Sequence, residues 1–398
     1  MLGRALSESA GDDARSGESD GAMRLGGNDY TLRELGGAFG DLGTLVPFLA
    51  GYITITGVDP AGLLLGFGVF GVVTGLHFKT PIAVQPMKAI GTAAISHAGM
   101  VTPGAVWASG LATGIFWLAM GISGVATWIA AATGRPVVQG LVLGLGLGFV
   151  REGVGLMQGD ALLAIAAAAL AFVLLSRPRV PAMLVLLALG AIAVVARDPS
   201  ALGPVTAAGL SPRLPRLPLE GFGWDAIATG IVGLALPQAA LTLGNAVVAT
   251  VETNNRLFPD RRVSVRAVAL DHGVMNLVGS GLGGVPMCHG AGGMAGHVRF
   301  GARTGGATVM LGVLLVAAGL LLADSVAAFF ALVPPAVLGV ILLVGGLELA
   351  VGAAGVAPDR ADGYVMALTA GVGMWNMGAG YLAGLALWHA YRRRWIAP

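Results

Sequence analysis

The chain of 398 residues has little charge and a single cysteine. Only 11% of its residues are charged, whereas soluble domains carry about 25%. With Cys288 alone, an intrachain disulfide and a multi-cysteine metal site are excluded. No Ser-His-Asp, paired-carboxylate or metal-ligand spacing stands out. We therefore expect no enzyme, no metal and no other cofactor, and the net charge of +2 does not indicate a nucleic acid partner.

Apolar residues dominate the chain instead. They make up 56% of it, the mean hydropathy is +0.81, and 65 residues are glycine. This composition is typical of a protein in a lipid bilayer, where small residues let helices approach closely. Hydropathy predicts an all-α, polytopic membrane protein with about 14 apolar segments. Several are shorter than the roughly 20 residues that a full crossing needs.

The segments divide into two sets of seven around a polar, proline-rich stretch. An odd number of spans in each set inverts the second half relative to the first, which predicts a 7+7 inverted repeat. The expected parts are a disordered tail at 1–28, the first repeat at 29–197, a connection at 198–222 and the second repeat at 223–398.

Positive charge predicts the direction of insertion. With the N-terminus in the cytoplasm, most arginines fall in cytoplasmic connections, as the positive-inside rule requires. Both termini are then cytoplasmic, and we expect the cell (inner) membrane. Only four arginines fall on the opposite side: Arg151, Arg197, Arg213 and Arg216.

Two short motifs occupy matching places in the halves. "PIAVQPMKAI" covers 81–90 and "GGVPMCHGAGG" covers 283–293. A shift of about 200 residues aligns Pro86-Met87 with Pro286-Met287, and paired proline-interrupted segments indicate a transporter binding site. Each proline can begin a helix at no cost in hydrogen bonds. Spans 3 and 10 are therefore predicted as half-helices that meet at mid-membrane.

The first motif supplies five candidate ligands around one helix start. N–H groups from Met87 to Ala89 would face the site, with the amide of Gln85 just before the turn and Pro86 at its start. Lys88 either faces an anionic substrate or snorkels to an interface.

In the second motif, Met287, Cys288, His289 and Gly290 would form the first helical turn. His289 could donate to an oxyanion, titrate near neutral pH, or bind another helix. Cys288 is read either as a packing residue or as a ligand contact.

Other polar residues lie elsewhere in apolar segments. Asp41, near Thr44 and Pro47, either caps a helix or organises the site and senses protons. Gln238 and Asn245 are seven residues apart and share a helix face, which lines the site or binds another helix. Asp271 is a candidate for proton coupling.

Charge arithmetic favours a dianion. Two helix N-termini supply roughly +0.5 each, and Lys88 adds one unit. Backbone N–H groups at helix starts are good oxyanion donors. A nucleobase would more naturally need carboxylates that read ring N–H groups.

The motifs together resemble the molybdate transporter family, relatives of the sulfate permease (SulP) superfamily. The likeness rests on "GAFGDLGTLVPF" (37–48), "PIAVQPMKAI" and "PMCHGAGGMAGHVRFGARTGG" (286–306) and extends over nearly all of 30–391. It implies import of molybdate. It also implies a core domain (spans 1–4 and 8–11) that moves against a gate domain (spans 5–7 and 12–14), with substrate between the starts of spans 3 and 10.

Alternatives remain open at this stage. Sulfate or tungstate shares the shape and charge of molybdate, and a nucleobase or other anion carrier could use the same fold. A channel or a membrane-embedded enzyme is a different class. Symport with protons is favoured over sodium because no cage of oxygen ligands is evident, and the sequence leaves a homodimer open.

Overall fold

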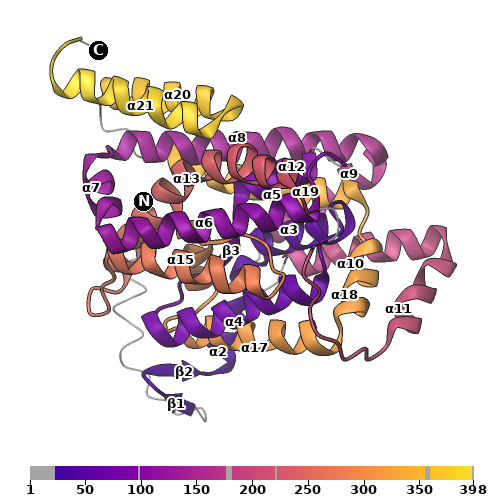
Figure 1. Ribbon diagram of the computed structural model, residues 1–398. Helices are drawn as coiled ribbons and strands as arrows, with labels where there is room; N and C mark the ends of the chain where they lie inside the picture. The colour runs from indigo at the N-terminus through magenta and orange to yellow at the C-terminus, as the bar shows by residue number, and fades with distance from the viewer. Residues whose placement is uncertain (1–22, 97–98, 176–181, 220–221, 355–358, 397–398) are drawn as a thin grey trace.

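The computed structural model describes residues 23–96, 99–175, 182–219, 222–354 and 359–396 (Figure 1). Within these ranges the chain is helical except for two short pairs of strands. The predicted all-α membrane fold is therefore confirmed. Five helices, or six if one pair bent by 95° counts as a span, are long and apolar enough to cross a bilayer. The exact set of 14 segments stays a prediction.

The first half of the chain contains nine described α-helices. They are α2 (Leu32–Ala38), α3 (Leu42–Thr54), α4 (Pro60–Phe78), α5 (Lys88–Ser96), α6 (Pro103–Ser123), α7 (Val125–Ala132), α8 (Arg135–Met157), α9 (Ala161–Leu175) and α10 (Ala182–Arg197).

The second half begins with one long helical stretch, 224–257, that contains two π-helical turns, η4 (Thr229–Ala235) and η5 (Thr242–Val248). Such turns are rare and often mark functional sites. The helices of this half are α12 (Trp224–Ala228), α13 (Leu236–Leu241), α14 (Ala249–Leu257), α15 (Val265–Gly281), α16 (Ala291–Arg299), α17 (Gly306–Leu321), α18 (Ala323–Ala331), α19 (Pro335–Ala354), α20 (Arg360–Trp375) and α21 (Met377–Arg392).

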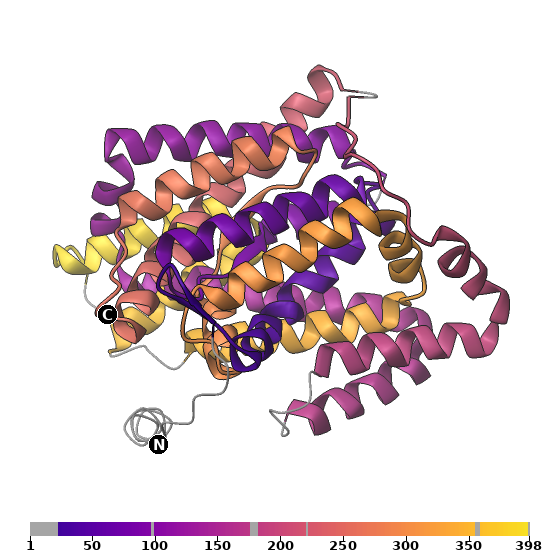
Figure 2. The ribbon, with the colours of Figure 1, turned by 90° about the horizontal axis from the view of Figure 1, so that it is seen from below.

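Helices from the two halves pack in pairs across the molecule. Figures 1 and 2 show α4 beside α17, while α6 packs on α15 and α8 on α19. Glycines permit the closest approach: a β-carbon on Gly146 of α8 would lie 2.7 Å from the carbonyl oxygen of Gly346 in α19. Such contact between small residues is the usual basis of helix association in membranes.

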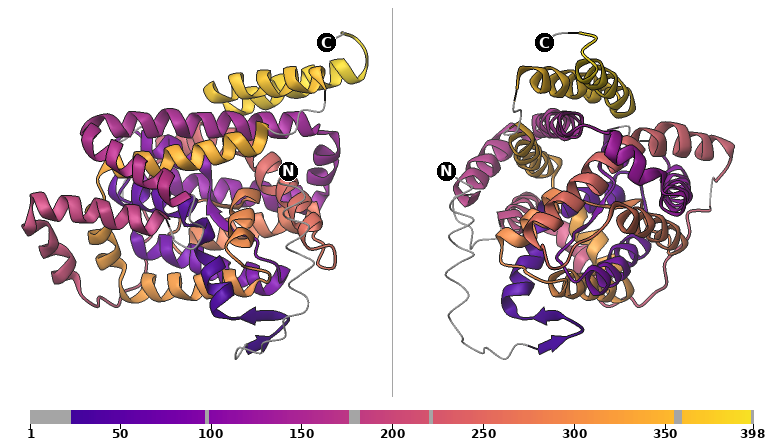
Figure 3. Two further views of the ribbon diagram at one scale, coloured as in Figure 1. Left: turned by 180° about the vertical axis from the view of Figure 1, so that it is seen from behind. Right: turned by 90° about the vertical axis from the view of Figure 1, so that its left-hand side faces the viewer.

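The paired helices form two groups. One group contains α8, α9, α19, α20 and α21, and the other contains α4, α6, α15 and α17; Figure 3 shows the yellow α20 and α21 lying against α8 at one side of the molecule. These groups correspond to the expected gate and core. Motion between them stays a prediction.

Two buried strands cross at the centre of the molecule. β3 (Val84–Pro86) pairs antiparallel with β4 (Met287–His289), with Val84 opposite His289 and Gln85 opposite Cys288. Met87 extends the pairing by donating its N–H to the carbonyl of Pro286, at 3.0 Å. The two Pro-Met motifs therefore meet as antiparallel strands at the centre of the molecule.

The strands correct the predicted helix starts. Both half-helices exist and have nine residues, but α5 begins at Lys88 and α16 only at Ala291. Met287 and His289 are extended because α15 satisfies the outer edge of β4. Asn276 bonds both the N–H and the carbonyl of Met287, each at 2.8 Å. The backbone hydrogen-bonding groups of Met287 therefore have partners in an extended strand, where a helical turn was predicted.

The N-terminal boundary also differs from expectation. Residues 1–22 of the predicted tail lie outside the described part of the chain. From residue 23 on the chain is folded: β1 (Met23–Leu25) pairs with β2 (Asn28–Tyr30), and Asn28 donates to the carbonyl of Gly75 at 3.0 Å. This hairpin therefore packs on the end of α4.

The connection between the halves is anchored at one end of the core group. It includes η3 (Pro199–Leu202) and α11 (Gly203–Ala208). Arg213 binds Asp59 at 2.7 Å and Asp324 at 3.0 Å. Because Asp59 is the N-cap of α4 and Asp324 lies in α18, the connection links elements of both halves.

Candidate functional site

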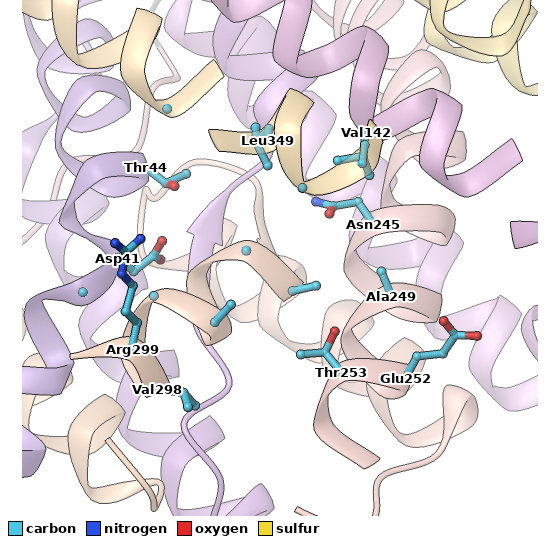
Figure 4. A pocket seen from close by; sticks show the side chains of 18 of the residues that line it. Asp41, Thr44, Val142, Asn245, Ala249, Glu252, Thr253, Val298, Arg299 and Leu349 are labelled. Atoms are coloured by element: carbon cyan, nitrogen blue, oxygen red, sulfur yellow. The ribbon is translucent and has the colours of Figure 1, made fainter. Parts of the chain in front are cut away.

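A cavity of about 1340 Å³ is lined by helices of both halves of the chain (Figure 4). Its wall includes residues of α2, α3, α5, α8, α14, α16 and α19 and of the π-helical turn η5. In Figure 4, Asp41 and Thr44 lie on one side and Asn245, Thr253 and Glu252 on the other. Four of the predicted site residues line it: Asp41, Thr44, Lys88 and Asn245.

Lys88 supplies the positive charge of the inner wall. Its side chain is only 1% exposed, yet it borders the cavity. We find no hydrogen bond or ion pair of its ammonium group within the described residues. A buried ammonium without a partner is costly, which favours an anion in the cavity over a side chain that snorkels to an interface.

The start of α16 also faces the cavity. Ala291 and Gly292 line it, and the N-cap, Gly290, has no side chain to satisfy the first N–H groups of the helix. These groups and the helix dipole favour an anion at this position. The α16 start and Lys88 thus combine on one side of the cavity.

Asp41 is tied to the crossing strands. Its Oδ1 accepts a 2.5 Å hydrogen bond from Nε2 of Gln85. Gly293 makes room for this pair, since a β-carbon there would collide with the Gln85 amide and lie 2.6 Å from Asp41 Oδ1. Gln85 is fully buried and therefore positions Asp41 rather than facing the cavity.

The start of α5 is occupied by a side chain. Gln238 Oε1 accepts from the N–H groups of Ala89, at 2.8 Å, and Ile90, at 3.4 Å, while its Nε2 donates to Thr242. Of the N–H groups expected to face substrate, those of Met87 and Ala89 are therefore bonded within the protein. Two helix starts were expected to face the anion. The start of α16 has no side-chain cap, whereas the start of α5 is capped by Gln238.

The remaining predicted ligands lie away from the cavity. Six residues are absent from the cavity wall and buried around the crossing strands: Pro86, Met87, Met287, Cys288, His289 and Gly290. The thiol of Cys288 donates weakly to the carbonyl of Pro86, at 3.7 Å. It behaves as a packing residue.

Two side chains pair behind strand β4. Nε2 of His289 lies 2.6 Å from Oδ2 of Asp271, and Nδ1 of His289 lies 2.9 Å from the carbonyl oxygen of Ala83. Neither residue touches the cavity. Asp271, which was predicted for proton coupling, is therefore in contact with His289 and lies behind the site.

Sequence analysis missed two features of this region. Asn276, which holds β4, carried no motif that could mark it. Arginines also line the cavity, and of these only Arg299 and Arg303 lie within a motif. Five residues form this arginine rim of the cavity wall: Arg33, Arg135, Arg256, Arg299 and Arg303.

Comparison with known proteins decides the family. Residues 33–149 and 230–349 match the family described as "Molybdate transporter of MFS superfamily". Molybdate transporter 2 of Arabidopsis thaliana is 30% identical over 429 residues, which cover 95% of this chain and 90% of the relative. The chain belongs to the molybdate transporter family. Molybdate transporter 1 of the same plant is also 30% identical, over 89% of this chain and 86% of its own.

Solved structures agree on the fold of this family member. The transmembrane domain of the cyanobacterial bicarbonate transporter BicA matches with a TM-score of 0.63 and 16% identity, covering 89% of this chain and 97% of BicA. Murine Solute Carrier 26 family member A9, an anion transporter in the inward-facing state, matches with a TM-score of 0.66 and 12% identity, covering 98% and 75%. At these identities the likeness shows the fold alone.

Family membership confirms the resemblance found in the sequence. This chain is therefore a multi-pass membrane transporter, and its relatives are named as transporters rather than enzymes. Among the described residues, no group of three or more His, Cys, Asp or Glu could hold a metal ion.

Proposed function

We propose that this chain imports molybdate by alternating access of the core group against the gate group, in symport with protons. The observation that carries the proposal is the cavity wall formed by Lys88 and the uncapped start of α16. Names of the relatives point to the same substrate.

Charge at the cavity suits a dianion that arrives with protons. Lys88 contributes one positive charge and the start of α16 roughly +0.5. Asp41, on the same wall, opposes an anion when it is ionised. Protonation of Asp41 therefore strengthens the attraction for a dianion, which links anion binding to uptake of a proton at this residue.

Membrane energetics also favour protons as co-substrate. Moving one charge across a potential of 100 mV costs about 2.3 kcal/mol, so inward movement of a dianion costs roughly 4.6 kcal/mol. Two protons carried with each molybdate would cancel this cost. Sodium is the second candidate, and a sodium gradient without a pH gradient distinguishes it.

The arginine rim suggests the direction in which the cavity opens. Arginines concentrate on cytoplasmic surfaces of membrane proteins, and five arginines line this cavity, among them Arg299, which Figure 4 labels. We therefore assign this structure to a state that is open to the cytoplasm. Both termini then lie on the cytoplasmic side of the cell membrane.

Uptake by the purified chain in proteoliposomes tests the proposal. We expect saturable accumulation of labelled molybdate that an inward proton gradient accelerates. Excess unlabelled molybdate and tungstate should compete strongly, and excess sulfate more weakly. Stronger competition by sulfate would reassign the substrate, and competition by a nucleobase alone would contradict the oxyanion site. Flux that does not saturate would indicate a channel.

A further inference from the structure

The His289–Asp271 pair has no part in the cavity wall, yet it is a buried ionisable pair. The side chain of His289 is fully buried and that of Asp271 is 10% exposed. Ionisable residues inside membrane segments are costly and usually functional. Their protonation can be counted from their hydrogen-bond partners.

His289 carries a proton on Nδ1 in this structure. That nitrogen lies 2.9 Å from the carbonyl oxygen of Ala83, which can only accept. A second proton lies between Nε2 and Asp271, because two lone pairs would repel each other at 2.6 Å. The pair is either imidazolium with carboxylate or imidazole with carboxylic acid, and both forms are neutral overall.

The neighbouring His272 cannot bind an additional proton without losing a hydrogen bond. Its Nδ1 donates to the carbonyl of Val268, at 2.7 Å, and its Nε2 accepts from the backbone N–H of His289, at 3.2 Å. These two bonds define one neutral tautomer. His272 is therefore a natural control for His289, with which it is in ring contact.

Other ionisable groups around the pair are few. α6 and η5 contribute no ionisable side chain to this region. On α5, Lys88 borders the cavity instead. Two further histidines lie nearby: His77, exposed next to Phe78 on α4, and His297 of α16, bonded to the carbonyl of Pro81.

We propose that the His289–Asp271 pair is a proton-binding site that is coupled to the anion site through strand β4 and the start of α16. Ala291 of the cavity wall follows His289 by two residues. Loss of the shared proton leaves a net negative charge directly behind the α16 start and repels the dianion. The proton and the anion therefore bind together and leave together. This pair would carry the second proton of the proposed symport, and Asp41 would carry the first.

The inference rests on the proposed function, and one set of measurements separates the two. The purified chain in proteoliposomes with a trapped pH indicator gives protons moved per molybdate. We expect Asp271→Asn and His289→Gln each to lower this ratio by about one proton, with uptake retained but more opposed by a negative-inside potential. His272→Gln, which keeps an acceptor for the His289 N–H, should keep the native ratio.

A second measurement does not depend on the folding of these variants. Molybdate affinity of Asp41→Asn, followed from about pH 5 to about pH 8, where histidine titrates in proteins, should still fall by about tenfold per pH unit over part of the range. An affinity independent of pH in Asp41→Asn, or a native proton ratio in both pair variants, overturns this inference alone. Failure of the native chain to bind or transport any oxyanion would instead overturn the proposed function.

Discussion

The side-chain oxygen of Gln238 lies 2.8 Å from the backbone nitrogen of Ala89 and caps the start of α5. An amide oxygen from another helix thus holds a position that an oxyanion could have taken. The second half has glycine, Gly290, at the corresponding helix start. The two half-helices therefore differ, because the start of α5 is capped by a side chain and the start of α16 is not.

The cap predicts the effect of Gln238→Ala. Loss of an N-terminal cap typically costs about 1 kcal/mol, and here the freed N–H groups are buried. We expect a lower melting temperature in detergent. Thr242→Val, which removes only the bond at Nε2, should cost less. A larger effect of Thr242→Val would show that the capping bond contributes little.

Lys88 tests the charge of the site. In Lys88→Ala, molybdate affinity should fall roughly a hundredfold or more, because a desolvated charge partner is worth about 3 kcal/mol. Lys88→Arg should also bind poorly, since a planar fork does not replace a compact ammonium. Lys79→Asn is the matched control: it removes the other lysine, at an exposed left-handed position that asparagine tolerates. Native binding by Lys88→Ala would contradict the site.

Asp41 tests coupling at the cavity. Molybdate uptake should be faster at acidic external pH in the native chain. In Asp41→Asn this dependence should flatten partly, because the amide still accepts from Gln85 but cannot titrate. Initial uptake rates at a series of external pH values measure the effect. If uptake by Asp41→Asn kept the full native dependence on external pH, the co-transported protons would bind at residues other than Asp41.

Two adjacent glycines of α16 make a matched pair. Gly293→Ala should abolish uptake, since the new methyl group would collide with the Gln85–Asp41 pair, and overpacking costs about 1–3 kcal/mol. Gly292→Ala should keep the native thermal stability, because its nearest contact would be the flexible end of Leu349, at 3.6 Å. Uptake and thermal stability of both variants, at equal expression, decide the comparison. Equal behaviour would contradict this packing.

The Asp59–Arg213 ion pair predicts stability in acid. Burial would raise the pKa of Asp59, but hydrogen bonds from Arg213, Arg216 and Gly62 outweigh it and hold this pKa below its ordinary value. A carboxyl group whose pKa is lowered by folding stabilises the fold at pH values above its ordinary pKa of about 3.9. This stabilisation is lost as the pH falls below that value. The melting temperature should therefore drop below about pH 4, and Asp59→Asn should show a smaller drop. An equal drop in both would assign the acid sensitivity to other groups.

Composition and hydropathy determined the class of this protein. Apolar runs identify a membrane protein because lipid excludes charge along a continuous stretch of chain, which is a local property. The Pro-Met motifs also marked the place where the helices are interrupted by the crossing strands, since proline and glycine interrupt helices wherever they stand. Lys88, Asp41, Thr44 and Asn245 could be proposed as site residues on these grounds.

Tertiary structure alone decided which polar group meets which. Because β3 pairs with β4, the chain is extended as far as His289, and α16 begins only at Ala291. Asn276 and His272 of another helix form hydrogen bonds with the backbone N–H groups at the outer edge of β4. Sequence spacing cannot reveal that Gln238 caps α5 or that His289 turns to Asp271. These choices follow from satisfying every buried hydrogen-bonding group, which depends on residues far apart in the chain.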